Sequence, residues 1–437
     1  MTSVKRLCTL ALLICLNSLL AQDLDNPFGE PDFKIQKEEN FSTFGFIRPT
    51  FRITNNSSPN AASHYLVSGL ATLRLGSRWE NEKWHLEGSW TGDAVSTNDM
   101  NSQQSKLTWS GTAANRFMHL ESEKSLESVL LKQRVHRLYA RYAAPKWAVS
   151  VGRLPVSWGE GRFLNPLNLI TPIDPFLLDM EDLPGADLVM LEWFPRPLDS
   201  FTLVMVPTRT RDNNRIDKIK LIDSTFMAKY QKHILDSDIS VLFGRHARSW
   251  TSAFEGVFDL DGTSLRGGYL LRMDDPRASS IISAPAPQQL THNLLVGTSH
   301  SFYGKYRASA EIFFTSRACD KQCQNLAGYE AFVNASLAPG LNNDISFYAT
   351  TGRILIRNPV LLQMSFGMNI LVNWSIDSVY LIDIQSQSMS IIGFSNYSIS
   401  EDLDFILGVW GFPFPGSENA DFPGRRLEGF CYMRKFF

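Results

Sequence analysis

Side chains that could support catalysis are present in this sequence, but their spacing does not fit a catalytic site. The chain has eight histidines, and the pair Ser299-His300 places a nucleophile next to a base. Neighbouring residues of a strand point to opposite faces, so this pair cannot form the hydrogen bond that nucleophilic catalysis needs. The motifs GxSxG and HExxH do not occur in the sequence. We therefore expect no enzymatic activity and no cofactor.

Two cysteines lie close together in RACDKQCQN, at Cys319 and Cys323. No histidine is near them, so the spacing favours a local disulfide over a metal site. We therefore expect no metal site in the chain. The net charge is −2, and no basic block is present, which argues against a nucleic-acid partner.

Other charged side chains gather around the stretch GRLPVSWGEGRFLNPLNLITPIDPF, residues 152–176. It has four prolines and three glycines among its 25 residues, and this composition is typical of a turn-rich connection. Charged groups tune ion selectivity where they line a narrow water path. The candidate residues in and just after this stretch are Trp158, Gly159, Glu160, Arg162, Asn165, Asp174 and Asp179.

The elements that would position these residues are β-strands. In WHLEGSWTGDA (84–94), apolar and aromatic residues alternate with polar residues, and this period of two is typical of a strand with one apolar face. Similar segments recur along the chain. With some lapses, short turns between them alternate with much longer connections. An outer-membrane barrel has this arrangement, because its turns are short on one side and its loops are long on the other.

The expected fold is a transmembrane antiparallel β-barrel. Strands that cross a bilayer must close on themselves, since every backbone group there needs a protein partner. We predict about 18 strands, with a range of roughly 16 to 20, because the strands near 246–262 and 376–398 are weakly marked. The final residue, Phe437, resembles the aromatic terminus of such barrels, although Lys435 occupies a place that is usually apolar. A secreted soluble β-protein is the rival, and it explains neither the loop asymmetry nor Phe437.

The amino terminus has the pattern of a secretory signal peptide. Lys5 and Arg6 precede a mostly apolar run that ends at Ala21, and a polar segment follows. The run is short for a membrane-spanning helix, which needs about 20 apolar residues. We therefore expect an exported protein of a Gram-negative outer membrane. Its expected parts are a signal peptide at 1–21, a periplasmic segment at 22–40 and the barrel at 41–437.

The connection 156–185 is too apolar to remain in water. If both termini are periplasmic, the strand 147–155 runs outward and the connection begins on the extracellular side. A long loop with many apolar side chains should pack on something, and the inner wall of the barrel is the nearest surface. We expect 156–185 to fold inward as a plug or constriction. A rigid turn that only seals the barrel is the alternative interpretation.

Basic residues on the preceding strands are candidates for the same interior. In LKQRVHRLYARY, Arg137 and Arg141 lie four residues apart and share a strand face with Val135. Arg153 is a further candidate. Such groups would favour anions in a pore, but pairing with carboxylates of the plug is the favoured interpretation. Just before them, a weak apolar stripe is compatible with a short surface helix from about 117 to 131.

The stretch resembles a family of bacterial outer-membrane barrels that is treated as porin-like and catalogued as a domain of unknown function. The resemblance covers residues 152–186. GRFLNPLNLITPID departs from the family's pattern, which often has more glycine after Trp-Gly-Glu. The matching residues are Gly152-Arg153, Trp158-Gly159-Glu160, Phe163, Asn165-Pro166, Asn168, Pro172, Asp174 and Pro184-Gly185-Ala186. The resemblance implies transport and names no substrate.

Together these observations predict a porin-like channel that passes small hydrophilic or amphipathic solutes and is constricted by 156–185. The alternative is a non-conducting, plugged barrel that serves in an envelope export complex or binds a surface. The expected partners are outer-membrane lipid, the barrel-assembly machinery and unknown small solutes. The alternative adds an envelope protein.

Overall fold

The computed structural model of the protein describes the barrel wall and part of the connection 156–185. The described residues are 41–57, 64–98, 118, 120–126, 129–161, 165–171, 183, 185–207, 209–212, 215–219, 221, 224–235, 237–246, 249–273, 290–316, 359–414 and 425–437. The expected signal peptide (1–21) and periplasmic segment (22–40) lie outside these residues. So do the candidate residues Arg162, Asp174, Asp179, Cys319 and Cys323.

The wall is built from long strands. Those that form it are β1 (Phe41–Ser57), β2 (His64–Glu80), β3 (Trp84–Thr97), β5 (Leu130–Ala144), β6 (Trp147–Leu154), β7 (Ala186–Arg196), β8 (Asp199–Val206), β11 (Thr225–Ile234), β12 (Ser237–His246), β13 (Ser249–Leu260), β14 (Thr263–Met273), β15 (Leu290–Phe302), β16 (Tyr306–Thr315), β17 (Val360–Leu371), β18 (Trp374–Asp383), β19 (Ser388–Ser400), β20 (Leu403–Phe414) and β21 (Arg425–Phe436). A shorter strand, β4 (Glu121–Ser125), pairs with β5. Two others, β9 (Arg209–Asp212) and β10 (Arg215–Ile219), form a separate two-stranded sheet.

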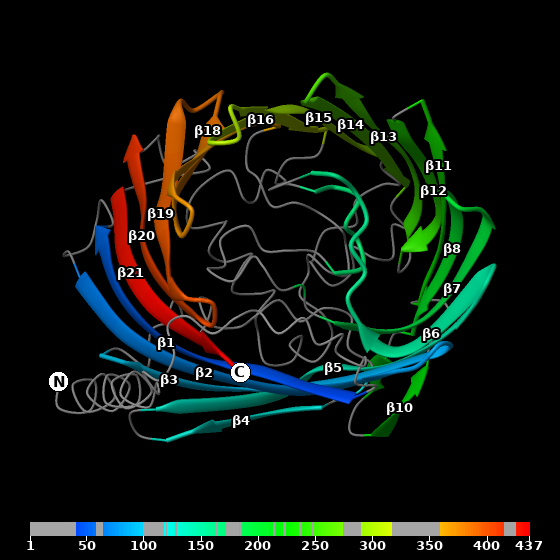
Figure 1. Ribbon diagram of the computed structural model, residues 1–437, viewed down its shortest axis with the longest axis horizontal. Coiled ribbons are helices and arrows are strands. Elements are labelled where there is room, and N and C mark those ends of the chain that lie inside the picture. The colour runs from blue at the N-terminus through cyan, green and yellow to red at the C-terminus, as the bar shows by residue number, and fades with distance from the viewer. Residues whose placement is uncertain are drawn as a thin grey trace, which may run out of the picture.

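Each wall strand is antiparallel to the next one, and the ring closes where β1 pairs with β21 (Figure 1). The last residue takes part in this closure. The N–H of Gly45 donates to the carbonyl oxygen of Phe437 at 2.9 Å, and the N–H of Phe437 donates back to the carbonyl oxygen of Gly45 at 3.1 Å. The sheet has 19 strands including β4, so 18 strands form the closed barrel. The predicted fold class and strand number are confirmed.

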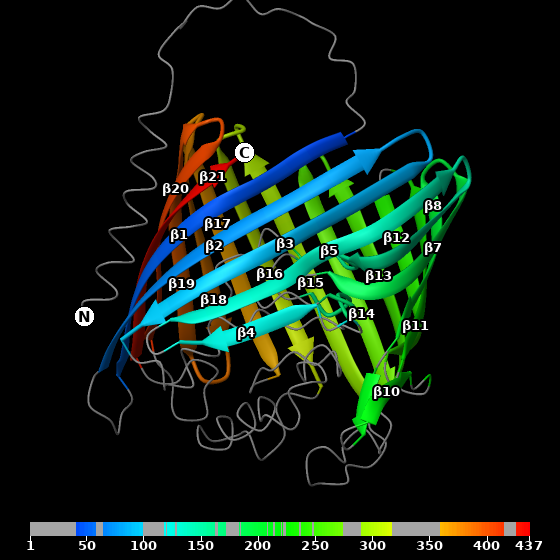
Figure 2. The ribbon, with the colours of Figure 1, turned by 90° about the horizontal axis from the view of Figure 1, so that it is seen from below.

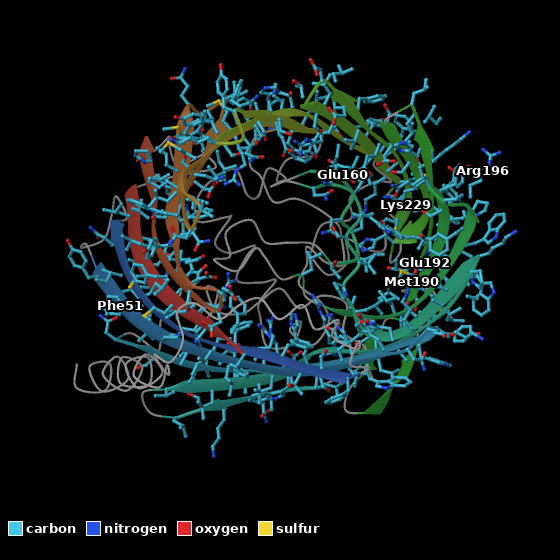
Figure 3. The ribbon with its side chains drawn as sticks, viewed as in Figure 1. Phe51, Glu160, Met190, Glu192, Arg196 and Lys229 are labelled. Carbon is cyan, nitrogen blue, oxygen red and sulfur yellow. The ribbon has the colours of Figure 1, made fainter. Side chains whose placement is uncertain are left out.

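Side chains alternate between the two faces of the wall, as the sequence pattern predicts. In β13, Thr251 and Glu255 are buried on the inner face, whereas Trp250 and Phe254 are exposed on the outer face. Figure 3 shows the same division around the ring, with Lys229 and Glu192 inside and Phe51 outside. An outer face of apolar and aromatic side chains around a polar interior is typical of a barrel in lipid.

Connections differ between the two ends of the barrel (Figure 2). The end that carries the C-terminus has short turns such as 81–83, 145–146 and 303–305. The other end has the long connections, with two exceptions at 247–248 and 384–387. These two short links join β12 to β13 and β18 to β19, which are strands that the sequence marked only weakly. The predicted alternation of loop lengths therefore holds except at these two places.

The described residues of 117–131 do not form the surface helix that the sequence allowed. Residues 121–125 form β4, whose Glu121 pairs with Arg134 of β5. The partner strand β6 reaches along β5 only as far as Leu138, so β4 occupies the edge of β5 that β6 leaves open. Open backbone groups at a strand edge favour pairing with a further strand. Among the residues that the structure describes, no helix is long and apolar enough to cross a membrane.

Candidate functional site

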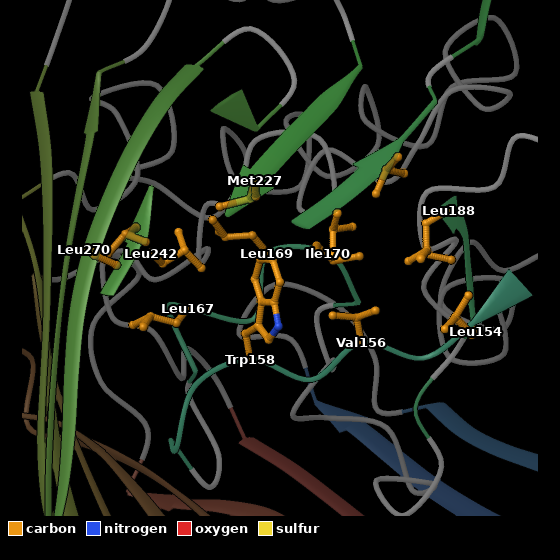
Figure 4. Close-up of a cluster of buried hydrophobic side chains, with 14 residues drawn as sticks. Leu154, Val156, Trp158, Leu167, Leu169, Ile170, Leu188, Met227, Leu242 and Leu270 are labelled. Carbon is orange, nitrogen blue, oxygen red and sulfur yellow. The ribbon is translucent and has the colours of Figure 1, made fainter. Parts of the chain in front are cut away.

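The described part of the connection 156–185 packs against one arc of the barrel wall (Figure 4). Its buried apolar side chains include Val156, Trp158, Leu167, Leu169 and Ile170. They share an apolar cluster with the wall residues Leu188, Val204, Val206, Met227, Leu242, Ala253 and Leu270. These wall side chains alternate with outward, exposed ones such as Leu203 and Val241, so they face the interior. Burying one large apolar side chain is worth about 1.5–3 kcal/mol, and several together hold the segment on the wall.

A tight turn shapes the start of this segment. Gly159 has φ +89°, a conformation that side chains other than glycine rarely adopt. The side-chain amide of Asn165 donates to the carbonyl oxygens of Trp158 at 3.0 Å and Gly159 at 2.9 Å. Further along, the hydroxyl of Thr171 donates to the carbonyl oxygen of Val156. The candidate residues Trp158, Gly159 and Asn165 therefore define the shape of the segment, and their role in a constriction stays a prediction.

Glu160 follows this turn, and two residues of the wall bind its backbone N–H and its carbonyl oxygen. Its N–H donates to Oε2 of Glu255 at 2.9 Å, and its carbonyl oxygen accepts from Nη1 of Arg266 at 3.2 Å. Glu255 and Arg266 are buried, on β13 and β14. The side chain of Glu160 is exposed, and it lies inside the ring (Figure 3). An exposed carboxylate on a fixed backbone can act on ions in the interior.

Arg137 and Arg141 of β5 both pair with carboxylates of the wall. Nη1 of Arg137 lies 3.2 Å from Oε1 of Glu87, and Arg141 forms an ion pair with Glu192 of β7. Glu192 points into the ring (Figure 3), so these two arginines lie on the inner face. Their carboxylate partners belong to the wall rather than to the described residues of the 156–185 segment. A role of these two arginines in acting on a solute stays a prediction.

The pairing of β3 with β5 shifts by one residue at His136. Arg137 lies opposite Ser89, whereas Val135 lies opposite Trp90. A β-bulge of this kind reverses the faces beyond it. Val135 therefore does not share the face of Arg137 as the simple alternation predicts. Arg134 does, and its Nη2 lies 3.8 Å from Oδ2 of Asp93.

Arg153 does not line the interior, which differs from the prediction. It lies opposite Asp187 across β6 and β7, on the face away from the interior residue Leu188. The pair is buried, with Nε of Arg153 2.7 Å from Oδ1 of Asp187. The remaining guanidinium nitrogens donate to the carbonyl oxygens of Val135 at 2.8 Å and Met118 at 2.5 Å. Arg153 thus joins the two ends of the 156–185 connection to Met118, and no part of it is left to contact a solute.

Arginines also line the inner face of β1, β2 and β21. The guanidinium carbon of Arg48 lies 5.5 Å from the ring centre of Tyr432, and that of Arg74 lies 4.9 Å from the ring centre of Phe46. Nη2 of Arg52 donates to Oε2 of Glu428 at 2.5 Å. Cation–π contacts and ion pairs of this kind fix the long arginine side chains along the wall. This part of the wall is rich in positive charge.

Glu255, Arg266 and Glu428 were not among the residues predicted from the sequence. Each is a charged residue on the inner face of a strand, in the alternating place of a polar residue. The alternating pattern predicts which face of the wall a side chain lies on, but not which residue it pairs with. The register between neighbouring strands is not evident from sequence alone. A charged residue flanked by outward aromatic residues, such as Glu255 after Phe254, is the available signal.

The C-terminal residues explain why Lys435 departs from the apolar pattern. Its Nζ forms an ion pair with Asp402, in the turn between β19 and β20. Phe437 closes the ring with Gly45, and a Cβ atom added at Gly45 would lie 2.6 Å from Cε2 of Phe437. The aromatic terminus is thus part of the wall. Its role as an assembly signal stays a prediction.

In the described part of the chain, no three His, Cys, Asp or Glu side chains gather in a way that could hold a metal ion. No protein-family model matches the sequence. No curated protein matches it either.

Solved structures do match. A BenF-like porin from Pseudomonas fluorescens Pf-5 aligns with a TM-score of 0.56 at 9% identity, over 91% of this chain and 99% of the porin. OccAB4 of Acinetobacter baumannii aligns with a TM-score of 0.51 at 10% identity, over 90% of this chain and 98% of OccAB4. The chain has the fold of outer-membrane porins. Pseudomonas aeruginosa OpdK, solved with vanillate, aligns with a TM-score of 0.52 at 8% identity, over 91% of this chain and 98% of OpdK. At these identities the porin likeness establishes the fold.

Proposed function

We propose that the protein is an outer-membrane, porin-like channel that passes small hydrophilic or amphipathic solutes and is constricted by residues 156–185. The observation that carries this proposal is the docking of 156–161 and 165–171 on one arc of the inner wall, along β8 and β11–β14. A closed barrel with a polar interior provides a water path. A segment docked on one side of that interior narrows the path and brings charged groups into it.

The class of solute follows from the side chains of the interior. Arginines of β1 and β2 lie against aromatic rings, and this combination suits small solutes that carry both a charge and an apolar part. The solved structure of OpdK with vanillate supports an amphipathic solute for a porin of this fold. Vanillate is a small aromatic carboxylate, but the interior of this chain names no single compound.

Liposome swelling tests the proposal. Purified protein is reconstituted into liposomes, and swelling is followed in iso-osmotic solutions of a small sugar, a larger sugar and a small organic anion. The expected result is faster swelling than in protein-free liposomes, with a rate that falls as solute size increases. Equal swelling with and without protein for every solute would contradict the channel.

The alternative is a non-conducting barrel with a role in an envelope complex or at the cell surface. One observation favours it: Leu167, Leu169 and Ile170 are almost completely buried, as a closed plug would also require. In that case the intact protein would not support swelling, and a variant without the segment would. A partner that moves the segment would then be sought among envelope proteins.

Residence in the outer membrane is part of the same proposal, with the barrel-assembly machinery as a transient partner. It rests on the apolar outer face of the barrel and on Phe437 at its closing seam. Removal of Phe437 is expected to lower the amount of protein in the outer-membrane fraction. Unchanged levels would argue against Phe437 as an assembly signal.

A further inference from the structure

Glu160 has glycine on both sides, at Gly159 and Gly161. Glycine has more backbone freedom than any other residue, so a Gly-Glu-Gly sequence does not fix the direction of its own carboxylate. The structure nevertheless holds both peptide groups of Glu160. Its N–H is bound by Glu255 at 2.9 Å and its carbonyl oxygen by Arg266 at 3.2 Å.

Both of these wall residues are held by further strands. Glu255 accepts from the hydroxyl of Ser240 at 3.1 Å, and its Oε1 lies 3.9 Å from Nζ of Lys229. Arg266 donates to the hydroxyl of Ser299 at 2.7 Å. Its Nη1 lies 3.3 Å from Oε1 of Glu311.

The network takes one side chain from each of six successive strands, β11 to β16. Its members are Lys229, Ser240, Glu255, Arg266, Ser299 and Glu311. Two of these groups are cationic and two are anionic, so they add no net charge to this part of the wall. The carboxylate of Glu160 is different, since it is exposed and lies inside the ring (Figure 3).

We propose that Glu255 and Arg266 are positioning residues that hold the carboxylate of Glu160 at a fixed place in the interior, where it raises the passage of cations relative to anions. This inference rests on the proposed channel function and adds the residue that sets charge preference on this side of the path. A unit charge about 4 Å from an ion in water changes the local ion concentration by a factor of about five. A mobile charge acts less, because its time-averaged distance from the ions is greater.

The test uses a matched pair of variants at one position, Glu255→Ala and Glu255→Gln. Both remove the same negative charge, but only glutamine keeps an oxygen that can accept from the N–H of Glu160. Reversal potentials across a planar bilayer in a salt gradient give the cation-to-anion permeability ratio. Glu160→Gln is expected to lower this ratio by a factor of about two to five. Glu255→Ala is expected to lower it in the same direction and to add noise to the open-channel current, and Glu255→Gln to retain most of the ratio.

A double-mutant cycle separates positioning from a direct effect of charge. In the Glu160→Gln background, Glu255→Ala is expected to produce no further change in the ratio. Glu428→Ala is the control, because it removes another buried carboxylate of the inner wall, which pairs with Arg52. Its effect on the ratio is expected to be the same with and without Glu160. An equal effect of Glu255→Ala in both backgrounds would overturn the inference, as would an unchanged ratio in Glu160→Gln.

Hydrogen exchange distinguishes failure of this inference from failure of the channel function. The peptide that contains Glu160 is expected to be protected in the native protein, in Glu255→Gln and in Glu428→Ala, and to exchange faster in Glu255→Ala. If no form conducts, the channel function and the charge preference both fail, and exchange still decides whether Glu255 positions Glu160. Equal exchange in all four proteins would refute the positioning role.

Discussion

A Cβ atom added at Gly159 would lie 2.1 Å from Oδ1 of Asn165. The two residues are that close because the amide of Asn165 donates to the carbonyl oxygens of both Trp158 and Gly159. The turn therefore needs glycine for two separate reasons, its positive φ and the lack of room. This turn aims Trp158 into the apolar cluster and presents Glu160 to the interior.

Replacement of Gly159 by alanine is expected to undo this turn without preventing the barrel from forming. Strain of this kind costs about 1–3 kcal/mol, and the clash with Asn165 adds to it. Conductance of single channels is expected to rise or to fluctuate between levels. Gly262→Ala is the control, because Gly262 has φ +77° but no heavy atom within 4 Å of an added Cβ. Steady, native-like conductance in Gly159→Ala would show that the turn does not control the path.

Trp158→Ala is expected to loosen the docked segment. The substitution removes a large side chain from a packed cluster, and such changes cost about 3–5 kcal/mol. Faster cleavage of the segment by an added protease and a higher conductance are expected. Trp410→Ala provides the comparison, since Trp410 is equally buried in a different cluster of the inner wall. If both variants behave alike, the apolar cluster around Trp158 has no special role in holding the segment.

The buried pair Arg153–Asp187 is expected to stabilise the barrel. Removing one partner of a buried ion pair costs about 3–5 kcal/mol, so Arg153→Met should lower the temperature at which the folded band disappears on a gel. Arg307→Met is the control, because Arg307 pairs with Asp377 at 3.0 Å but its side chain is 49% exposed. An exposed pair is worth about 0–1 kcal/mol. Equal shifts in the two variants would contradict the assignment of Arg153 to a structural role.

The stability that the Lys435–Asp402 pair contributes is expected to depend on pH. The hydrogen bond from Lys435, with a second from Ser400, lowers the pKa of Asp402 from its ordinary value of 3.8. Since the pKa in the folded protein is the lower one, the pair contributes stability above the unfolded pKa and loses it as pH falls through the folded pKa. The difference in unfolding temperature between the native protein and Lys435→Met should therefore vanish in strong acid. A constant difference across that range would contradict the pair.

The wall of the barrel could be predicted from sequence because lipid outside and polar groups inside force a period of two. This is clear in β3, where Trp84 and Leu86 alternate with His85 and Glu87. Loop lengths were a weaker guide. The links 247–248 and 384–387 are short at the end where long connections are the rule, so the strands beside them were only weakly marked.

The interior contacts could not be predicted to the same extent. Arg134 lies on the inner face because of the β-bulge at His136, and no residue of the sequence indicates that bulge. The outward position of Arg153 could have been predicted from sequence, because simple alternation places it on the same outer face as Trp147, Val149 and Val151. Its partner Asp187 starts the next wall strand on the same face. Contacts between the 156–185 segment and the wall depend on three-dimensional packing, so Glu255 and Arg266 became visible only in the structure.

Single-channel conductance in a planar bilayer distinguishes an open, constricted channel from a closed plug when the intact protein is measured beside a variant that lacks residues 158–182. The intact protein is expected to conduct and the variant to conduct more, because the segment narrows an open path. Conduction by the variant alone would identify the segment as a closed plug. Absence of conduction in both proteins would contradict the proposed channel function.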